Sequence, residues 1–184
     1  MRRIFSALIF FCITYGCYSQ ANENMKTVTG VKGISVSIGV NVPVGDFAST
    51  HIAGIAIDCS PARVSFRMKR TKKIAFTYNG GVALYLGKKE TVSNYSYTYP
   101  AYFFINAYGG VLYNPMKGGS ITLTAGPTIS IYNGNTEFSS GSKLEASYYI
   151  SPRIAIGPGI MLMKLSKADP IWAASFKVTL NFDK

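Results

Sequence analysis

Acidic residues and histidine are scarce in this sequence of 184 residues, which has eight aspartates and glutamates together and one histidine. Metal centres and acid–base sites are built mainly from carboxylate, imidazole and thiolate groups, so few such sites can be assembled here. Charged residues make up 15% of the chain, against about 25% in a typical soluble domain. The mean hydropathy of +0.17 excludes a highly charged disordered chain. We therefore expect a folded protein with no metal site, no cofactor and no catalytic residues.

Long hydrophobic runs are missing as well. The longest apolar run covers residues 4–14, and it is too short for a transmembrane helix, which needs roughly 20 apolar residues. It follows Arg2 and Arg3, and small residues precede Gln20. A basic start, a short apolar run and small residues before a cut are typical of a secretory signal peptide. The pattern predicts a signal peptide over residues 1–19 and export of the chain.

Cysteine is the third scarce residue, with three in the chain. An alternative to simple cleavage makes Cys17 the lipidated residue of a lipoprotein. Under either cut the folded part keeps Cys59 alone, so no intramolecular disulfide can form. We expect a short N-terminal extension over 20–32 and one folded domain over 33–184.

What the chain does have is strict alternation of apolar with small or polar residues. Residues 34–42 read ISVSIGVNV, and the same period recurs over 120–132 and 172–182. Alternation is the period of a β-strand with one apolar face, and no comparable stretch after the signal has a helical period. The predicted strands cover 33–44, 51–67, 73–87, 101–113, 119–133, 143–150, 153–166 and 171–182. We therefore predict an all-β fold with eight strands and no helix.

The predicted connections differ in length between the two ends of the strands. The longer or more polar ones lie near 45–50, 88–100 and 134–142, whereas short turns lie at 68–72, 114–118 and 151–152. If the chain starts and ends on one side, the longer loops fall on the other. Outer-membrane barrels have this asymmetry, together with an even number of antiparallel strands. The pattern favours a single up-and-down transmembrane β-barrel.

The non-apolar strand faces also favour a membrane. They consist of serine, threonine, glycine, alanine and asparagine with few charges, whereas soluble strands usually expose lysine and glutamate there. Small residues suit the crowded interior of an eight-stranded barrel. Aromatic residues such as Tyr102 and Trp172 cluster near strand ends, as in interfacial girdles. A soluble barrel or sandwich that binds a small apolar ligand remains an alternative.

Two prolines bear on whether the barrel closes. Pro127 and Pro158 lie inside predicted strands, each directly after a glycine. Proline removes a backbone donor and is usually found at edges or bulges. We interpret the two Gly-Pro pairs as bulges or strand starts near a rim. They could instead mark the edges of an open sheet.

Two segments carry a resemblance to a known family. The segment GVNVPVGDF over 39–47 resembles the first hairpin of small outer-membrane β-barrel proteins of the Bacteroidota type, and WAASFKVTLNF over 172–182 resembles their closing strand. The resemblance implies an eight-stranded barrel domain like those of OmpA and OmpX. It also implies an outer-membrane location, with outer loops that meet a partner or lipopolysaccharide.

The single histidine is the one candidate for chemistry. His51 follows Asp46, Ser49 and Thr50 in the first predicted loop. A hydroxyl within hydrogen-bond reach of this base could act on the acyl chains of lipid A, as in some small outer-membrane barrels. Because adjacent residues on a strand point to opposite faces, we expect Ser49 rather than Thr50 to reach His51. We favour the simpler interpretation, a loop histidine that caps a turn.

The remaining charged residues suggest structural roles. Asp58 lies on the opposite face of its strand from Ile55 and Ile57, so we expect its side chain to point into the barrel. There it could pair with Arg63, Arg67 or Lys177. The basic run over 67–73 predicts a solvated turn that can contact anionic lipid heads. Nucleic acid is not an expected partner, because an exported barrel offers no stable basic surface interleaved with aromatics.

Taken together, the residues favour an outer-membrane barrel with a structural, adhesive or accessory role and no enzymatic activity. The expected partners are outer-membrane lipid, lipopolysaccharide and a protein bound by the outer loops. The alternatives are a lipid-A-modifying enzyme that uses His51, and the soluble β-protein described above.

Overall fold

The computed structural model describes residues 33–61, 74–116, 118–151, 153–165 and 169–183. Several sequence predictions lie outside these residues. They are the signal peptide with its cleavage before Gln20, Cys17, the extension over 20–32, the basic run over 67–73, and Arg63 and Arg67. They stay predictions.

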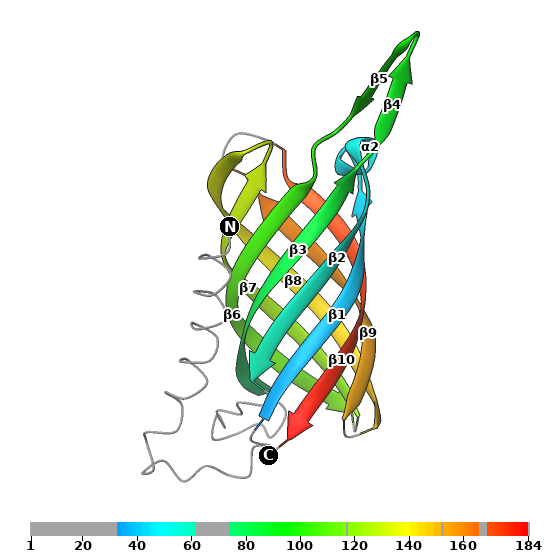
Figure 1. Ribbon diagram of the computed structural model, residues 1–184. Coiled ribbons are helices and arrows are strands. Elements are labelled where there is room, and N and C mark those ends of the chain that lie inside the picture. The colour runs from blue at the N-terminus through cyan, green and yellow to red at the C-terminus, as the bar shows by residue number, and fades with distance from the viewer. Residues whose placement is uncertain (1–32, 62–73, 117, 152, 166–168, 184) are drawn as a thin grey trace. The chain divides into compact units, whose positions relative to one another are not determined.

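Eight antiparallel strands form a closed barrel in the order β1-β10-β9-β8-β7-β6-β3-β2, as Figure 1 shows. The strands are β1 (Gly33–Val44), β2 (His51–Pro61), β3 (Ile74–Gly87), β6 (Tyr102–Met116), β7 (Gly119–Tyr132), β8 (Asn135–Ser151), β9 (Ile154–Lys164) and β10 (Ile171–Asp183). Consecutive strands of the barrel are neighbours, and β1 pairs with β10 from Gly33↔Asp183 to Val44↔Trp172. The predicted eight-stranded up-and-down barrel is confirmed.

The two ends of the barrel are distinguished by the chain termini and by a projecting hairpin. The end at which β1 starts and β10 finishes is called the terminal end. At the opposite end, a separate hairpin of β4 (Lys89–Val92) and β5 (Tyr95–Thr98) projects beyond the rim between β3 and β6 (Figure 1). We call this the hairpin end.

The barrel closes in spite of its two internal prolines. Pro127 pairs with Ser140, and Pro158 pairs with Phe176, both in mid-strand. Neither open edges nor register shifts occur there, so the interpretations as bulges, strand starts or sheet edges were wrong. The preceding glycines explain why. A Cβ on Gly126 would lie 2.3 Å from the Ala107 carbonyl oxygen of β6, so the bare glycine lets the neighbouring strand approach closely.

The predicted loop over 134–142 is wrong. The turn is only Asn133-Gly134, and β8 starts at Asn135 instead of residue 143. Both turn residues have positive φ, at 48° for Asn133 and 78° for Gly134. Asn-Gly is the preferred pair for a two-residue hairpin turn that requires φ > 0 at both positions. The strands can therefore continue up to the turn.

Two further corrections concern the hairpin end. Residues Phe47–Thr50 form a short helix, α2, where no helix was predicted after the signal. Four residues are too few for a helical period to be visible in the sequence. The predicted loop over 88–100 contains the β4–β5 hairpin, whose turn places Ser93 at φ 56°.

The barrel is apolar outside, and many polar side chains are buried inside it. Large apolar side chains are exposed on all eight strands; Ile38 and Val40 of β1 are 52% and 54% exposed. Buried polar residues face the interior, among them Ser35, Asn41, Asn79, Asn106, Thr124, Thr128 and Ser130. This is the reverse of a soluble barrel or sandwich with an apolar core.

Among the described residues, no helix is both long enough and apolar enough to cross a membrane.

Candidate functional sites in the barrel interior and at the hairpin end

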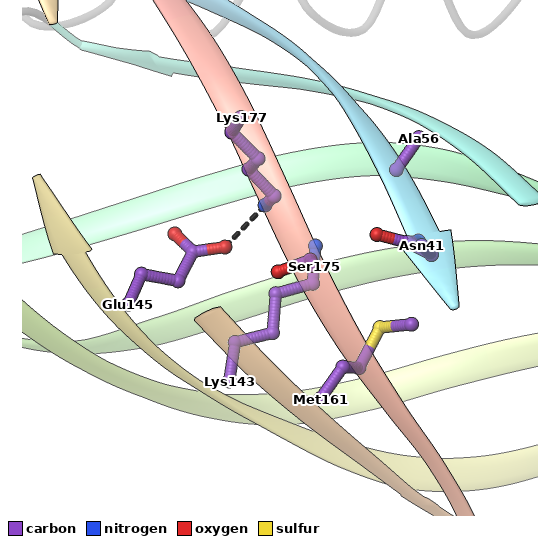
Figure 2. A pocket seen from close by; sticks show the side chains of 7 residues that line it. All are labelled: Asn41, Ala56, Lys143, Glu145, Met161, Ser175 and Lys177. Atoms are coloured by element: carbon purple, nitrogen blue, oxygen red, sulfur yellow. Dashed lines mark hydrogen bonds and ion pairs between the residues drawn. The ribbon is translucent and has the colours of Figure 1, made fainter. Parts of the chain in front are cut away.

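Four charged side chains from three strands meet in the middle of the barrel. Lys143 Nζ of β8 donates to Asp58 Oδ1 of β2 at 2.6 Å. Lys177 of β10 donates to Asp58 Oδ2 and also to Glu145 Oε1 of β8. Two cations thus neutralise two carboxylates. Figure 2 shows Lys177 reaching Glu145, with Lys143 beside them.

Glycines on the inner rows make space for this ionic cluster. A Cβ at Gly81 would lie 2.0 Å from Asp58 Oδ1, and one at Gly39 would lie 2.5 Å from Lys177 Cγ. Neither glycine has a positive φ, so their role here is to leave room. The small residues in the sequence therefore mark the places where long charged side chains cross the interior.

The sequence identified part of the cluster. Of the three candidate partners predicted for Asp58, Lys177 does pair with it, Arg63 and Arg67 lie outside the described residues, and Lys143 and Glu145 were missed. Both lie on β8, within the segment 143–150 that was predicted as the sixth strand. Their alternation with Leu144, which is 48% exposed, was the available signal that they point inward.

The interior is filled around the ionic cluster. The pocket next to it is lined by Asn41, Ala56, Lys143, Glu145, Met161, Ser175 and Lys177 (Figure 2), and it leaves no space for a water molecule. Towards the hairpin end the filling becomes apolar. Tyr85, Phe104 and Met163 are essentially fully buried, and the rings of Tyr85 and Phe104 meet edge to face at 5.8 Å. A polar layer and an apolar layer thus both obstruct the barrel.

His51 lies at the mouth of the barrel, where α2 ends and β2 begins. Its backbone N–H donates to the Phe47 carbonyl and so caps α2 at its C-terminal end. The side chain is 3% exposed. Its Nε2 lies 3.2 Å from the carbonyl oxygen of Pro100, which can only accept, so Nε2 carries the proton.

The expected partner of His51 was wrong. Thr50 Oγ1 lies 2.8 Å from His51 Nδ1, whereas Ser49 donates to the Asp46 carbonyl at 2.6 Å. Thr50 belongs to α2 and not to a strand, so strand alternation does not apply to it. The helical turn brings the adjacent hydroxyl and imidazole to the same side.

Aromatic rings cover the mouth. His51 stacks on Phe47 with ring centroids 4.4 Å apart, and Tyr102 stacks between Tyr132 at 4.5 Å and Phe104 at 4.8 Å. Residues from α2, β2, β6 and β7 therefore form one continuous layer. This layer closes the apolar half of the interior at the hairpin end.

The β4–β5 hairpin has two chemically different faces. Its register pairs Glu90 with Tyr97 and Val92 with Tyr95, which places these four side chains on one face. The other face carries Lys89, Thr91, Ser96 and Thr98. Tyr99 extends the first face, because its hydroxyl donates to Glu90 Oε2 at 3.2 Å and its ring meets that of Tyr97 at 5.1 Å. We call Glu90, Val92, Tyr95, Tyr97 and Tyr99 the tyrosine face.

No protein-family model matches the chain, and no curated protein sequence matches it. Solved structures do match. The outer membrane protein Ail of Yersinia pestis, determined in a phospholipid bilayer nanodisc, matches with a TM-score of 0.53 and 11% identity over 82% of this chain and 99% of its own.

The N-terminal β-barrel domain of Pseudomonas aeruginosa OprF matches with a TM-score of 0.51 and 10% identity, over 84% of this chain and 100% of that domain. The outer membrane enzyme PagL matches with a TM-score of 0.50 and 8% identity, over 79% and 98%. This chain shares its fold with small outer-membrane β-barrels. The finer resemblance to barrels of the Bacteroidota type stays a prediction.

No site for metal chemistry accompanies this fold in the part of the chain that the structure describes. Within those residues, no three histidine, cysteine, aspartate or glutamate side chains gather closely enough to hold a metal ion. The described features that differ from a plain barrel are the ionic cluster, the aromatic mouth with Thr50 and His51, and the tyrosine face.

Proposed function

We propose that the protein spans an outer membrane as an obstructed barrel and acts, without catalysis, through the structures at its hairpin end. The apolar outer face supports the membrane location. Its exposed rows would be costly in water, but lipid solvates them, and a closed barrel leaves no unpaired strand edge in the hydrocarbon. Neighbours with the same fold are outer-membrane proteins.

The connections support an orientation with the hairpin end outside the cell. Long extracellular loops and short periplasmic turns are typical of outer-membrane barrels. The hairpin end carries α2 and the β4–β5 hairpin, whereas at the terminal end β8 finishes at Ser151 and β9 starts at Ile154. The hairpin and the mouth would then face the exterior.

The ionic cluster is the observation on which the non-transporting role rests. Asp58 is held between Lys143 and Lys177 in an interior without room for water beside them. A structural, adhesive or accessory role therefore falls to the exterior surface, with lipopolysaccharide, membrane lipid or a protein as partner. Ail, which is named an attachment invasion locus protein and has been solved with a heparin analogue, has the same fold.

Membrane fractionation with heat-dependent gel mobility tests this proposal. We expect the protein in the outer-membrane fraction, with a folded band that shifts on boiling. Liposomes that contain the purified barrel should not swell in small sugars. Protein that stays in the supernatant without detergent, or liposomes that swell rapidly, would contradict the proposal.

A lipid-A-modifying enzyme is the second candidate, and one contact favours it. Thr50 Oγ1 lies within hydrogen-bond distance of His51 Nδ1, as a nucleophile and its base must. The enzyme PagL also has this fold. We rank this candidate second because His51 is buried and its other nitrogen is bonded to Pro100.

Mass spectrometry of lipid A separates the two candidates. Cells that produce the protein, its His51→Ala variant or its Thr50→Val variant should have the same lipid A as cells without it. The enzyme would be established if the lipid A structure changed in cells with the intact protein but stayed unmodified in cells with either variant.

A further inference from the structure

We infer that the tyrosine face of the β4–β5 hairpin binds an uncharged saccharide chain presented outside the protein's own membrane. The inference deepens the proposed function, because it names the partner of the hairpin end and rests on that end facing the exterior.

The tyrosine face is open and nothing in the described chain covers its outer part. Tyr95 is 84% exposed, Val92 is 71% and Tyr97 is 56%. Contiguous exposed apolar groups on a folded protein mark interaction sites. The opposite face of the same hairpin, with Thr91 and Ser96, offers no such surface.

Tyrosine suits a sugar better than it suits lipid or a hydrophobic protein groove. Each phenol presents a flat apolar face, against which the C–H groups of a pyranose ring can pack, and a hydroxyl at its edge for hydrogen bonding. Tyrosine is also a rigid contact residue that loses little conformational entropy on binding. Tyr97 and Tyr99 are already held edge to face at 5.1 Å, so part of the platform is ordered before a ligand arrives.

A carboxylate completes the platform and limits the charge of the ligand. Glu90 accepts the hydroxyl of Tyr99 through Oε2, and its other oxygen can accept from a sugar hydroxyl. Glu90 carries the one charge among the five residues of the tyrosine face. Lys89 lies on the opposite face, and the ammonium group of Lys88, beside Tyr99, is bonded to the Ala48 carbonyl. Sulfated or phosphorylated chains would be repelled, so an uncharged saccharide fits best.

The tyrosine face can contact more than one sugar unit of a chain. Tyr99 is directly followed by Pro100, whose carbonyl oxygen lies 3.2 Å from His51 Nε2 at the barrel mouth. The ring of His51 lies 6.3 Å from that of Tyr132, which stacks on Tyr102 at 4.5 Å. Aromatic groups therefore continue from the hairpin tip to the mouth. Such a row can contact several units of a chain, and weak contacts to single units then add up. The hairpin projects beyond the rim (Figure 1), which favours a chain on another surface.

The test is a glycan array probed with the purified, detergent-folded full barrel, followed by calorimetry with dextran, soluble β-glucan and mannan. We expect binding to at least one neutral chain and none to heparin. Tyr97→Ala should weaken binding about tenfold, as loss of an aromatic anchor does. Tyr97→Phe should retain most of it, because the ring face stays.

Thr91→Ala, on the opposite face, is the matched control and should leave the affinity unchanged. Heat-dependent gel mobility shows that each variant is folded. The inference is overturned if a folded barrel binds none of the neutral chains, binds only heparin, lipopolysaccharide of the producing cell or a protein, or binds equally well after Tyr97→Ala. Those outcomes contradict only the saccharide inference and are compatible with a membrane barrel. Absence of the protein from the outer-membrane fraction would contradict the proposed function itself.

Discussion

Asp58 and Lys143 lie 85 positions apart in the chain, yet Lys143 Nζ is 2.6 Å from Asp58 Oδ1 in the centre of the barrel. Both side chains are almost completely buried. The contact ties β2 to β8, which are not neighbours in the sheet, across the interior. The stability of the barrel should therefore depend on the charge balance at this point.

Replacing Asp58 tests that dependence. Asp58→Asn leaves two buried lysines with Glu145 as their one carboxylate, and breaking a buried pair in this way costs about 3–5 kcal/mol. Denaturant unfolding of the detergent-folded barrel, followed by tryptophan fluorescence, would measure the loss. Asp46→Asn, at an exposed position, is the control and should change stability by less than about 0.5 kcal/mol.

A second replacement should restore part of the loss. Asp58→Asn combined with Lys143→Met leaves one cation and one anion, Lys177 and Glu145, which remain paired. The double variant should be more stable than Asp58→Asn alone. If the two substitutions simply add, charge balance is not the source of the effect.

The glycine before each internal proline should resist substitution. A Cβ on Gly126 would meet the Ala107 carbonyl oxygen at 2.3 Å, whereas one on Gly109 would meet nothing within 4 Å. Gly126→Ala should destabilise the barrel by about 1–3 kcal/mol, as overpacking does. Gly109→Ala should have little effect in the same unfolding assay. Equal results for the two variants would mean that the close approach of β6 is unimportant.

A charge introduced on the outer face tests the proposed contact of this face with lipid. Ile38 is 52% exposed and sits in mid-strand between Ile57 and Val178. In a bilayer, Ile38→Arg should destabilise the barrel by about 2–4 kcal/mol, as arginine does near the membrane midplane. Folding into lipid vesicles at graded urea would reveal it. Thr91→Arg on the hairpin is the comparison, and an equally small effect at both positions would argue for a water-exposed surface.

The tyrosine face should have a measurable pH response. The pKa of Tyr99 is raised, first because its hydroxyl donates to the Glu90 carboxylate. A raised pKa means that this bond is intact at neutral pH and is lost as the pH rises through the pKa of the folded protein. In tyrosine-labelled ¹³C NMR, Glu90→Gln should lower the pH at which the Tyr99 signal titrates. A titration that does not move would show that the bond is not formed in solution.

The alternation of residues was enough to predict the barrel, because outward-facing and inner positions differ in chemistry along most strands. It failed over 135–142, where Phe138 is the one large apolar residue facing outward. That part of β8 is held by its pairing with β7, from Asn135↔Tyr132 to Gly141↔Gly126, and not by an apolar row of its own. The Asn-Gly turn was the local signal for this extension.

The sites were less predictable than the strands. Contacts such as Thr50 with His51 depend on a helical turn too short to leave a period in the sequence. The pairing of Asp58 with Lys143 depends on which strands face each other across the interior. Which strands face each other is set by the closure and the stagger of the whole barrel, and no local sequence pattern reveals it.

The position of Lys177 on the last strand has a consequence for the order of assembly. Before β10 docks, the interior holds Asp58, Glu145 and Lys143, one positive charge short of neutrality. The missing cation arrives with the strand that also joins β1 and removes the last open edge. A barrel without β10 lacks both the charge balance of its interior and the pairing that closes the sheet, so we expect the docking of this strand to be cooperative.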